Sequence, residues 1–301
     1  MDEEWDHLIV LDGCRYDYFS RLHSVHLDGK LERALSVGSN TEEWRDNSFP
    51  DRYGDVVYIS ANPYINSRIE VRGFSGSEHF LDVVDVWDWG WDLTLGTVHP
   101  DTVNRAAREA LMQYPGERLI IHYLQPHCPY IGMQPQDTGF PVQAPGVRTV
   151  LDGTKVPRGT TVREKVVDII TAVTKSSPLR NLDAVNDGHL WLLRERMGLP
   201  PETPMDSVRR SMGVEGLRRA YTENLRLVLD RFSVLLSSLQ GRVVVTADHG
   251  ELLGEGGRFS HGHGRREKLL LEVPWFVVKR SSSAMRPRGK PQKSGIPMKL
   301  L

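Results

Sequence analysis

Three short apolar runs constrain the fold more than any other feature of this 301-residue chain. They cover residues 7–11, 119–123 and 242–246, and they are apolar almost throughout instead of alternating with polar residues. Runs of four to eight such residues are typical of strands that are buried on both faces. Strands of this kind belong to parallel sheets that are covered by helices on both sides. The sequence therefore predicts an α/β fold with a mostly parallel central sheet.

Helical patterns alternate with these runs along the chain. Apolar residues three or four apart predict helices at about 15–22, 101–113 and 214–239. Further strands are predicted at 56–59, 81–86 and 273–278. This alternation favours helices on both faces of the sheet, with ligands bound outside the carboxyl ends of its strands.

We interpret residues 1–280 as one α/β domain. Residues 131–213 interrupt it as an insertion or lid, because 134–161 are rich in proline, glycine and polar residues and 163–213 have a mostly helical pattern. Residues 281–301 carry five basic residues and no acidic one, and we expect this basic tail to be disordered.

Composition excludes several classes of protein. Lysine and arginine number 38 and aspartate and glutamate 39, so no excess of positive charge favours nucleic acid as a partner. Two cysteines are too few for a disulfide framework, and Cys14 is expected to be a small buried residue. No apolar run approaches the roughly 18–20 residues that cross a bilayer, and the acidic residues 1–6 do not fit a signal peptide. The expected location is the cytoplasm.

Two acidic residues directly follow predicted strands. Asp12 comes after 7–11, and Asp248, with His249 beside it, comes after 242–246. Because the carboxyl ends of parallel strands meet at one edge of a sheet, these side chains are expected to converge. Each aspartate alone could instead cap the turn that follows it. Two carboxylates and an imidazole together favour a divalent-metal site.

A hydroxyl-rich turn at residues 36–44 precedes a predicted helix. Asn40 or Thr41 could cap that helix. A hydroxyl at a helix N-terminus lies in positive potential, which lowers the cost of forming its alkoxide, although plain capping is the alternative. Elsewhere, Trp87, Trp89 and Trp91 alternate, and this favours packing on one face of a strand.

Taken together, these segments resemble the alkaline phosphatase superfamily, and its sulfatase-like branch most closely. The segments that carry the resemblance are residues 8–15, 38–44, 126–130, 221–230 and 243–255. The resemblance implies a metal-dependent hydrolase or transferase of phosphate or sulfate esters that forms a covalent ester with the protein. The expected substrate is a small molecule or a glycan- or lipid-derived ester.

The resemblance also assigns roles to residues. Asp12, Asp248 and His249 match metal ligands, and Thr41 matches a nucleophile that also ligates the metal. His127 matches a histidine that contacts the transferred group or the leaving oxygen. His261 matches a histidine that serves substrate or a second metal. Arg15 matches an arginine that helps to hold the oxyanion. The ligand set suits Mn, Zn or Ca, with at least one ion per chain.

The chain departs from the resemblance in one informative way. It has no Cys/Ser-x-Pro/Ala-x-Arg segment, in which sulfatases make formylglycine. This favours unmodified hydroxyl chemistry, as in the phosphoethanolamine transferases, and phosphate over sulfate. Ser39 is a rival to Thr41 as the nucleophile. Two other functions stay open: a phosphomutase-like isomerase with two metals, and a catalytically silent binding protein on this fold.

Overall fold

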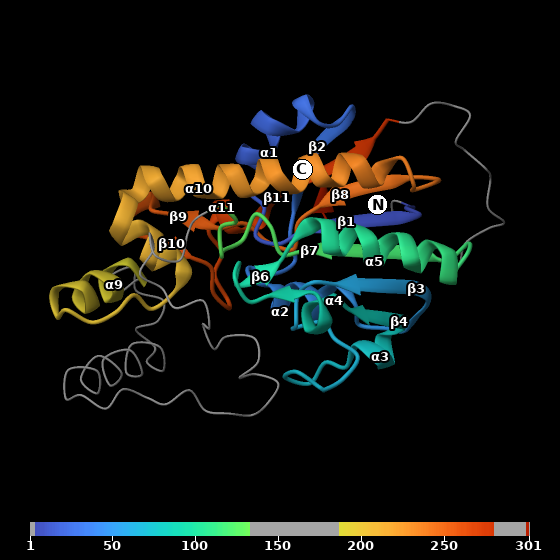
Figure 1. Cartoon of the computed structure of the whole chain (residues 1–301), viewed down its shortest axis with the longest axis horizontal. Coiled ribbons are helices and arrows are strands. Elements are labelled where there is room, and N and C mark those ends of the chain that lie inside the picture. The colour runs from blue at the N-terminus through green and yellow to red at the C-terminus, as the bar shows by residue number, and fades with distance from the viewer. Residues whose placement is uncertain (1–3, 133–186, 280–298, 301) are drawn as a thin grey trace. The chain divides into compact units, whose positions relative to one another are not determined.

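The computed structural model describes residues 4–132, 187–279 and 299–300 (Figure 1). The chain divides into two compact units. The first comprises Met1–Ile131, Tyr221–Glu251 and His261–Leu301, and the second comprises Gly132–Ala220 and Leu252–Ser260. The insertion predicted at 131–213 thus falls almost entirely in the second unit. Of that insertion, 133–186 lie outside the described residues, and its role as a lid stays a prediction.

The first unit is built on an eight-stranded sheet with the order β12-β2-β11-β8-β1-β7-β3-β4. Neighbours from β8 to β4 are parallel, whereas β11, β2 and β12 are added antiparallel at one side. This confirms the predicted α/β fold with a mostly parallel sheet. The strands are β1 (His7–Leu11), β2 (Gly29–Leu35), β3 (Tyr53–Ser60), β4 (Phe80–Asp85), β7 (Arg118–Tyr123), β8 (Val243–Thr246), β11 (Glu272–Val278) and β12 (Lys299–Leu300).

The central strand β1 is buried along its whole length, as its apolar sequence predicts. It pairs with β7 on one side and β8 on the other, and Val10 lies opposite both His122 and Thr246. The carboxyl ends of these three strands therefore meet at one edge of the sheet. Each strand leads there into a loop that carries polar residues.

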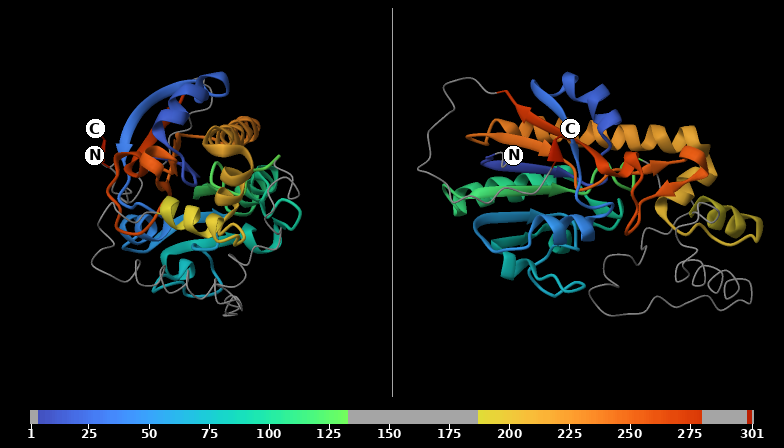
Figure 2. Two further views of the ribbon diagram at one scale, coloured as in Figure 1. Left: turned by 90° about the vertical axis from the view of Figure 1, so that its left-hand side faces the viewer. Right: turned by 180° about the vertical axis from the view of Figure 1, so that it is seen from behind.

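Helices cover both faces of the sheet, as predicted. Tyr123 donates a hydrogen bond to Asn104 of α5 (Pro100–Gln113), while the neighbouring His122 has its ring 6.0 Å from Trp44 of α2 (Thr41–Ser48). Successive residues of a strand point to opposite faces, so α5 and α2 lie on opposite sides. Helix α10 (Pro204–Leu236) runs beside α5, where Asn104 donates to the carbonyl of Arg231 (Figures 1 and 2).

Shorter elements complete the first unit: α1 (Tyr16–Leu22), η1 (His23–Val25), α3 (Gly76–His79), α4 (Val86–Trp89), β5 (Trp91–Asp92), β6 (Thr97–Val98) and α11 (Lys268–Leu271). The second unit contains α9 (Asp187–Arg196), the first part of α10, and the strand pair β9 (Leu252–Leu253) and β10 (Phe259–Ser260), with η3 (Glu255–Gly257) between them. Its core includes Trp191, which packs on Phe259. No described helix has the length and apolar character that a bilayer crossing requires.

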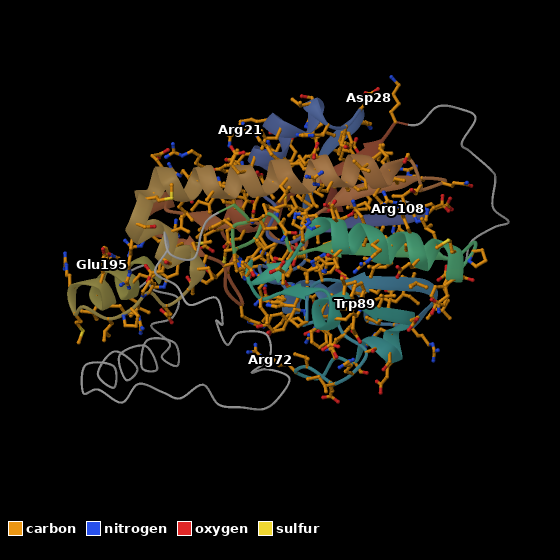
Figure 3. All side chains as sticks on the ribbon, in the orientation of Figure 1. Arg21, Asp28, Arg72, Trp89, Arg108 and Glu195 are labelled. Carbon is orange, nitrogen blue, oxygen red and sulfur yellow. The ribbon has the colours of Figure 1, made fainter. Side chains whose placement is uncertain are left out.

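Two sequence predictions differ from the structure. The three tryptophans do not share a strand face: Trp87 is buried in the short helix α4, Trp89 ends that helix and is 48% exposed, and Trp91 begins β5 (Figure 3). In the basic tail, Lys299 and Leu300 form the edge strand β12, which pairs with β2, instead of being disordered. The rest of the tail, 280–298 and residue 301, lies outside the described residues.

Substitution in the central strand tests this account of the core. Ile9→Ala removes a fully buried side chain between two parallel neighbours, and we expect it to lower the free energy of unfolding by about 3 kcal/mol in a urea titration. Val25→Ala, at a position that is 82% exposed, is the control and should change it by no more than about 0.5 kcal/mol. Equal effects of the two substitutions would contradict the placement of β1.

Candidate active site

Asp12, Asp248 and His249 come together at the carboxyl edge of β1 and β8, as the sequence predicts. Each of the three offers a ligand atom, and these atoms lie within 4.8 Å of one another. The backbone N–H of Gly13 donates to Asp248 Oδ1 at 3.0 Å, which joins the turn after β1 to the turn after β8. All three side chains are buried. This set is called the aspartate group below.

Thr41 faces the aspartate group from the first turn of α2. Its hydroxyl donates to Asp248 Oδ2 at 2.7 Å and lies 3.5 Å from His249 Nε2. Asn40 is the N-cap of this helix, and its side chain accepts from the N–H of Glu43. The rival Ser39 is bound elsewhere, because its hydroxyl lies 2.7 Å from a carboxylate oxygen of Glu43. The geometry therefore favours Thr41 over Ser39 as the nucleophile.

The two buried carboxylates of the aspartate group have opposite pKa shifts. Burial, and then the charge of Asp248, raise the pKa of Asp12 to about 7. Burial alone would also raise the pKa of Asp248, but His249, His122 and hydrogen bonds from Thr41 and Gly13 bring it below the ordinary value. One carboxylate is thus held as an anion while its neighbour keeps a proton up to about neutral pH. A cation between them would remove this conflict.

Two further polar residues in this site were not predicted from the sequence. Asn62 Nδ2 donates to Asp12 Oδ2 at 2.7 Å and lies 3.4 Å from Thr41 Oγ1. His122 lies on β7 with Nε2 3.9 Å from Asp12 and 4.0 Å from Asp248, and the Tyr58 hydroxyl holds its Nδ1 at 2.8 Å. Burial lowers the pKa of His122 to about 4, so it is neutral at neutral pH. Asn62 follows β3 as Asp12 follows β1, and that position was the signal available in the sequence.

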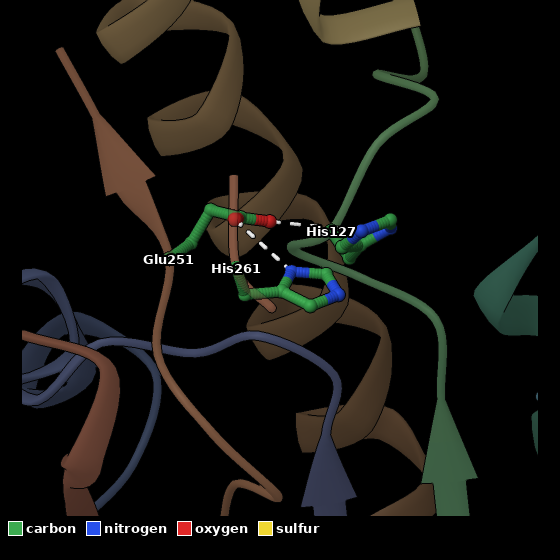
Figure 4. Close-up of side chains that lie close together, drawn as sticks. All are labelled: His127, Glu251 and His261. Carbon is green, nitrogen blue, oxygen red and sulfur yellow. Dashed lines mark hydrogen bonds and ion pairs between the residues drawn. The ribbon is translucent and has the colours of Figure 1, made fainter. Parts of the chain in front are cut away.

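A second cluster lies next to the first. His127, Glu251 and His261 also place ligand atoms within 4.8 Å of one another, and we call them the histidine group (Figure 4). Glu251 points its carboxylate between the two imidazoles, 3.1 Å from His261 Nδ1 and 3.6 Å from His127 Nε2. The rings of His249 and His261 have centroids only 4.2 Å apart, so the two groups adjoin. Glu251 supplies the member that sequence reasoning missed.

The histidine group carries opposite charges at close range. Burial alone would raise the pKa of Glu251, but His261, His127 and His249 lower it below the ordinary value. Burial would lower the pKa of His127, whereas Cys128, Asp12 and Glu251 together raise it well above the ordinary value. His127 therefore holds its proton more tightly than an ordinary histidine does. Among the described residues, Glu251 Oε2 is a buried oxygen without a hydrogen-bond partner, which suits a ligand atom.

Arg15 binds Asp17 and the main chain of Glu251 in this structure. Its guanidinium binds Asp17 through two hydrogen bonds of 2.9 Å, and its Nη1 donates to the carbonyl oxygen of Glu251 at 3.2 Å. In this structure it supports the loop that carries Glu251. The role of Arg15 in holding an oxyanion stays a prediction.

No family model and no curated protein matches the sequence. Solved structures with a similar fold include the integral membrane lipooligosaccharide phosphoethanolamine transferase A of Neisseria meningitidis, at 12% identity and a TM-score of 0.48, covering 90% of this chain and 47% of that one. The 2-O GAG sulfatase BT1596 is 14% identical, with a TM-score of 0.46 and coverage of 92% and 65%. The phosphonate monoester hydrolase of Silicibacter pomeroyi is 15% identical, with a TM-score of 0.40 and coverage of 90% and 67%.

These three proteins are a transferase, a hydrolase and a sulfatase. The chain spans about half the length of the membrane transferase. Because all three TM-scores are below 0.5, the function proposed below depends on the side chains of this chain alone.

The raised pKa of Asp12 makes a testable prediction about stability without metal. Its carboxyl titrates near 3.8 when unfolded and near 7 when folded, so folding takes up a proton between these pH values. This contribution to stability is full below about pH 4 and is lost as the pH rises to about 7. Thermal unfolding in chelator should therefore show wild type losing stability relative to Asp12→Asn over that range. A wild type that keeps or gains stability relative to Asp12→Asn as the pH rises from about 4 to 7 would contradict the shift.

Proposed function

We propose that this chain is a divalent-cation-dependent hydrolase or transferase of phosphate or sulfate esters that uses Thr41 as its nucleophile. The observation that carries the proposal is the hydrogen bond of 2.7 Å from the Thr41 hydroxyl to Asp248, inside a buried cluster of two carboxylates and an imidazole. A threonine that only capped its helix would not need this acidic, buried setting.

The residues present fit a divalent cation. Asp12, Asp248, His249 and Thr41 offer oxygen and imidazole donors that suit Mn, Zn or Ca. Without a cation, burial and the neighbouring Asp248 keep Asp12 protonated up to a pKa of about 7. When bound, the cation would lower the pKa of the Thr41 hydroxyl and polarise the ester.

The protein's own groups orient the nucleophile. The hydrogen bond directs the Thr41 proton to Asp248, which would accept it as the oxygen attacks, and leaves the oxygen lone pairs free for that attack. The N-terminus of α2 adds positive potential at the same oxygen. Asn62 Nδ2, 3.4 Å from Thr41 Oγ1, is placed to donate to an oxygen of the group that Thr41 receives.

His127 is suited to the leaving group. Cys128, Asp12 and Glu251 raise its pKa well above the ordinary value, and its side chain is 25% exposed, so a substrate can reach it. A proton from His127 would neutralise the oxygen that departs as the bond to Thr41 forms. Water or an acceptor alcohol would then release the group from Thr41, giving hydrolysis or transfer.

Phosphate esters are the favoured substrates within this proposal. An unmodified threonine replaces the formylglycine of the best-known sulfatases, since the chain has no segment for that modification. Small-molecule, glycan-derived and lipid-derived esters all stay candidates. A cytoplasmic location also stays a prediction.

The histidine group favours a second candidate, a phosphomutase-like isomerase with two cations. His127, Glu251 and His261 supply a second set of converging ligand atoms beside the first, which the sequence alone did not provide. A catalytically silent binding protein is disfavoured by the same convergence. It would have no need for a buried anionic cluster around a hydroxyl.

Substitution of the nucleophile tests the main proposal. With Mn²⁺ or Zn²⁺ and aryl phosphate monoesters, diesters and aryl sulfate, Thr41→Ala should lower kcat at least about a thousandfold, because the covalent step is lost. Thr41→Ser should retain a measurable rate. Ser39→Ala is the control and should keep the nucleophile. If Thr41→Ala and wild type turn over every ester equally, Thr41 is not the nucleophile.

Metal stoichiometry separates the two candidates. If the isomerase is correct, metal analysis should find two ions per chain, and Glu251→Gln should reduce this to one because the histidine group loses its carboxylate. If the esterase or transferase uses one ion, wild type and Glu251→Gln should each hold one, and Asp248→Asn should hold none. Zinc retained by Asp248→Asn but lost by Glu251→Gln would contradict the assignment of the aspartate group.

A further inference from the structure

The loop that carries His127 has no helix or strand of its own. It follows β7, and its described part runs to residue 132. Among its backbone contacts is the N–H of His127, which donates to the carbonyl of Asp12 at 3.1 Å. Such a loop needs side-chain partners to fix its shape, because it lacks the repeating hydrogen bonds of a regular element.

One buried side chain of α10 supplies several of these partners. Asn224 accepts a hydrogen bond from the N–H of Ile131 at 2.8 Å. Its amide nitrogen lies 3.4 Å from the carbonyl of Pro126, 3.2 Å from that of His127 and 3.1 Å from that of Pro129. Asn224 is fully buried. Its hydrogen bonds to Pro126 and Ile131 join both ends of the segment around His127.

We infer that Asn224 is the positioning residue that holds His127 in the histidine group. This inference rests on the proposed function, since it gives the motif at 221–230 a role in that site. The amide is the suitable side chain here, because its oxygen accepts from Ile131 and its two N–H donors are shared among the three carbonyls. A carboxylate would face those carbonyl oxygens without a proton, and an apolar side chain would leave them unpaired.

The preceding turn of α10 fixes the other side of the site independently. The Tyr221 hydroxyl donates to the carbonyl of Gly13 at 2.6 Å and accepts from the N–H of Arg15 at 3.0 Å. Tyr221 and Asn224 are three residues apart and therefore share one face of the helix. Through Tyr221, that face holds the turn after Asp12. Through Asn224, it holds the loop that carries His127. The helix thus sets the position of His127 relative to the aspartate group.

A double-mutant cycle tests the inference. Asn224→Leu keeps a buried side chain of similar size but removes all four hydrogen bonds. With bis(4-nitrophenyl) phosphate and Mn²⁺, it should lower kcat/KM about 10- to 100-fold in the wild-type background. In the His127→Ala background the same change should cost less than about twofold, because Asn224 then has no imidazole to position. Glu223→Ala, on the exposed side of the same turn, is the control.

A readout without substrate keeps the inference separate from the proposed function. The imidazole NMR resonance of His127, assigned by its loss in His127→Ala, should shift or broaden in Asn224→Leu and stay unchanged in Glu223→Ala. If Asn224→Leu does not fold, Asn224→Ser, which keeps one hydroxyl donor, takes its place and should show a smaller change of the same kind.

Two results would overturn the inference: an unchanged His127 resonance, or an equal loss of kcat/KM in both backgrounds. The second result would mean that Asn224 stabilises the fold in general. If wild type is inactive but the His127 resonance shifts in Asn224→Leu, the proposed function is contradicted, whereas the positioning of His127 by Asn224 is supported.

Discussion

The site is organised around the close approach of two buried carboxylates, Asp12 and Asp248. Adjacent parallel strands end beside each other, so residues that follow β1 and β8 are brought together by the sheet itself. Burial makes their like charges costly, and the pKa of Asp12 rises to about 7 in response. A bound cation would stabilise both carboxylates at once. The side chains around the two carboxylates, Thr41, Asn62 and His122, fit a cation-dependent site.

Around this pair the fold adds groups from separate elements. Helix α2 presents Thr41 at its positive end, the loop after β3 presents Asn62, and the strand β7 places His122 on the same face of the sheet. The neutral state of His122 follows from burial, which lowers its pKa to about 4. The histidine group adjoins the aspartate group through the rings of His249 and His261, which lie close together at a tilt. In the proposed function, attack by Thr41 and proton transfer from His127 would therefore act on one substrate.

The sequence predicted what depends on local patterns. Apolar runs identify the central parallel strands, and acidic residues directly after them identify Asp12 and Asp248. The strand β2, next to the edge of the sheet, was missed because it is half-exposed, charged and antiparallel to its neighbours, so it lacks an apolar run. Glu251 was missed as a member of the histidine group because of where its partners lie in the sequence. His127 is far away along the chain, and His261 is in another loop. Their meeting is set by tertiary packing, which no spacing in the sequence records.

The assignment of Thr41 within a cation site is tested most directly by anomalous diffraction from a crystal soaked in Mn²⁺. The account predicts one strong anomalous peak in contact with the side chains of Asp12, Thr41, Asp248 and His249. A peak that touches other residues only, or ordered density in which the Thr41 hydroxyl turns away from a bound ion, would contradict it.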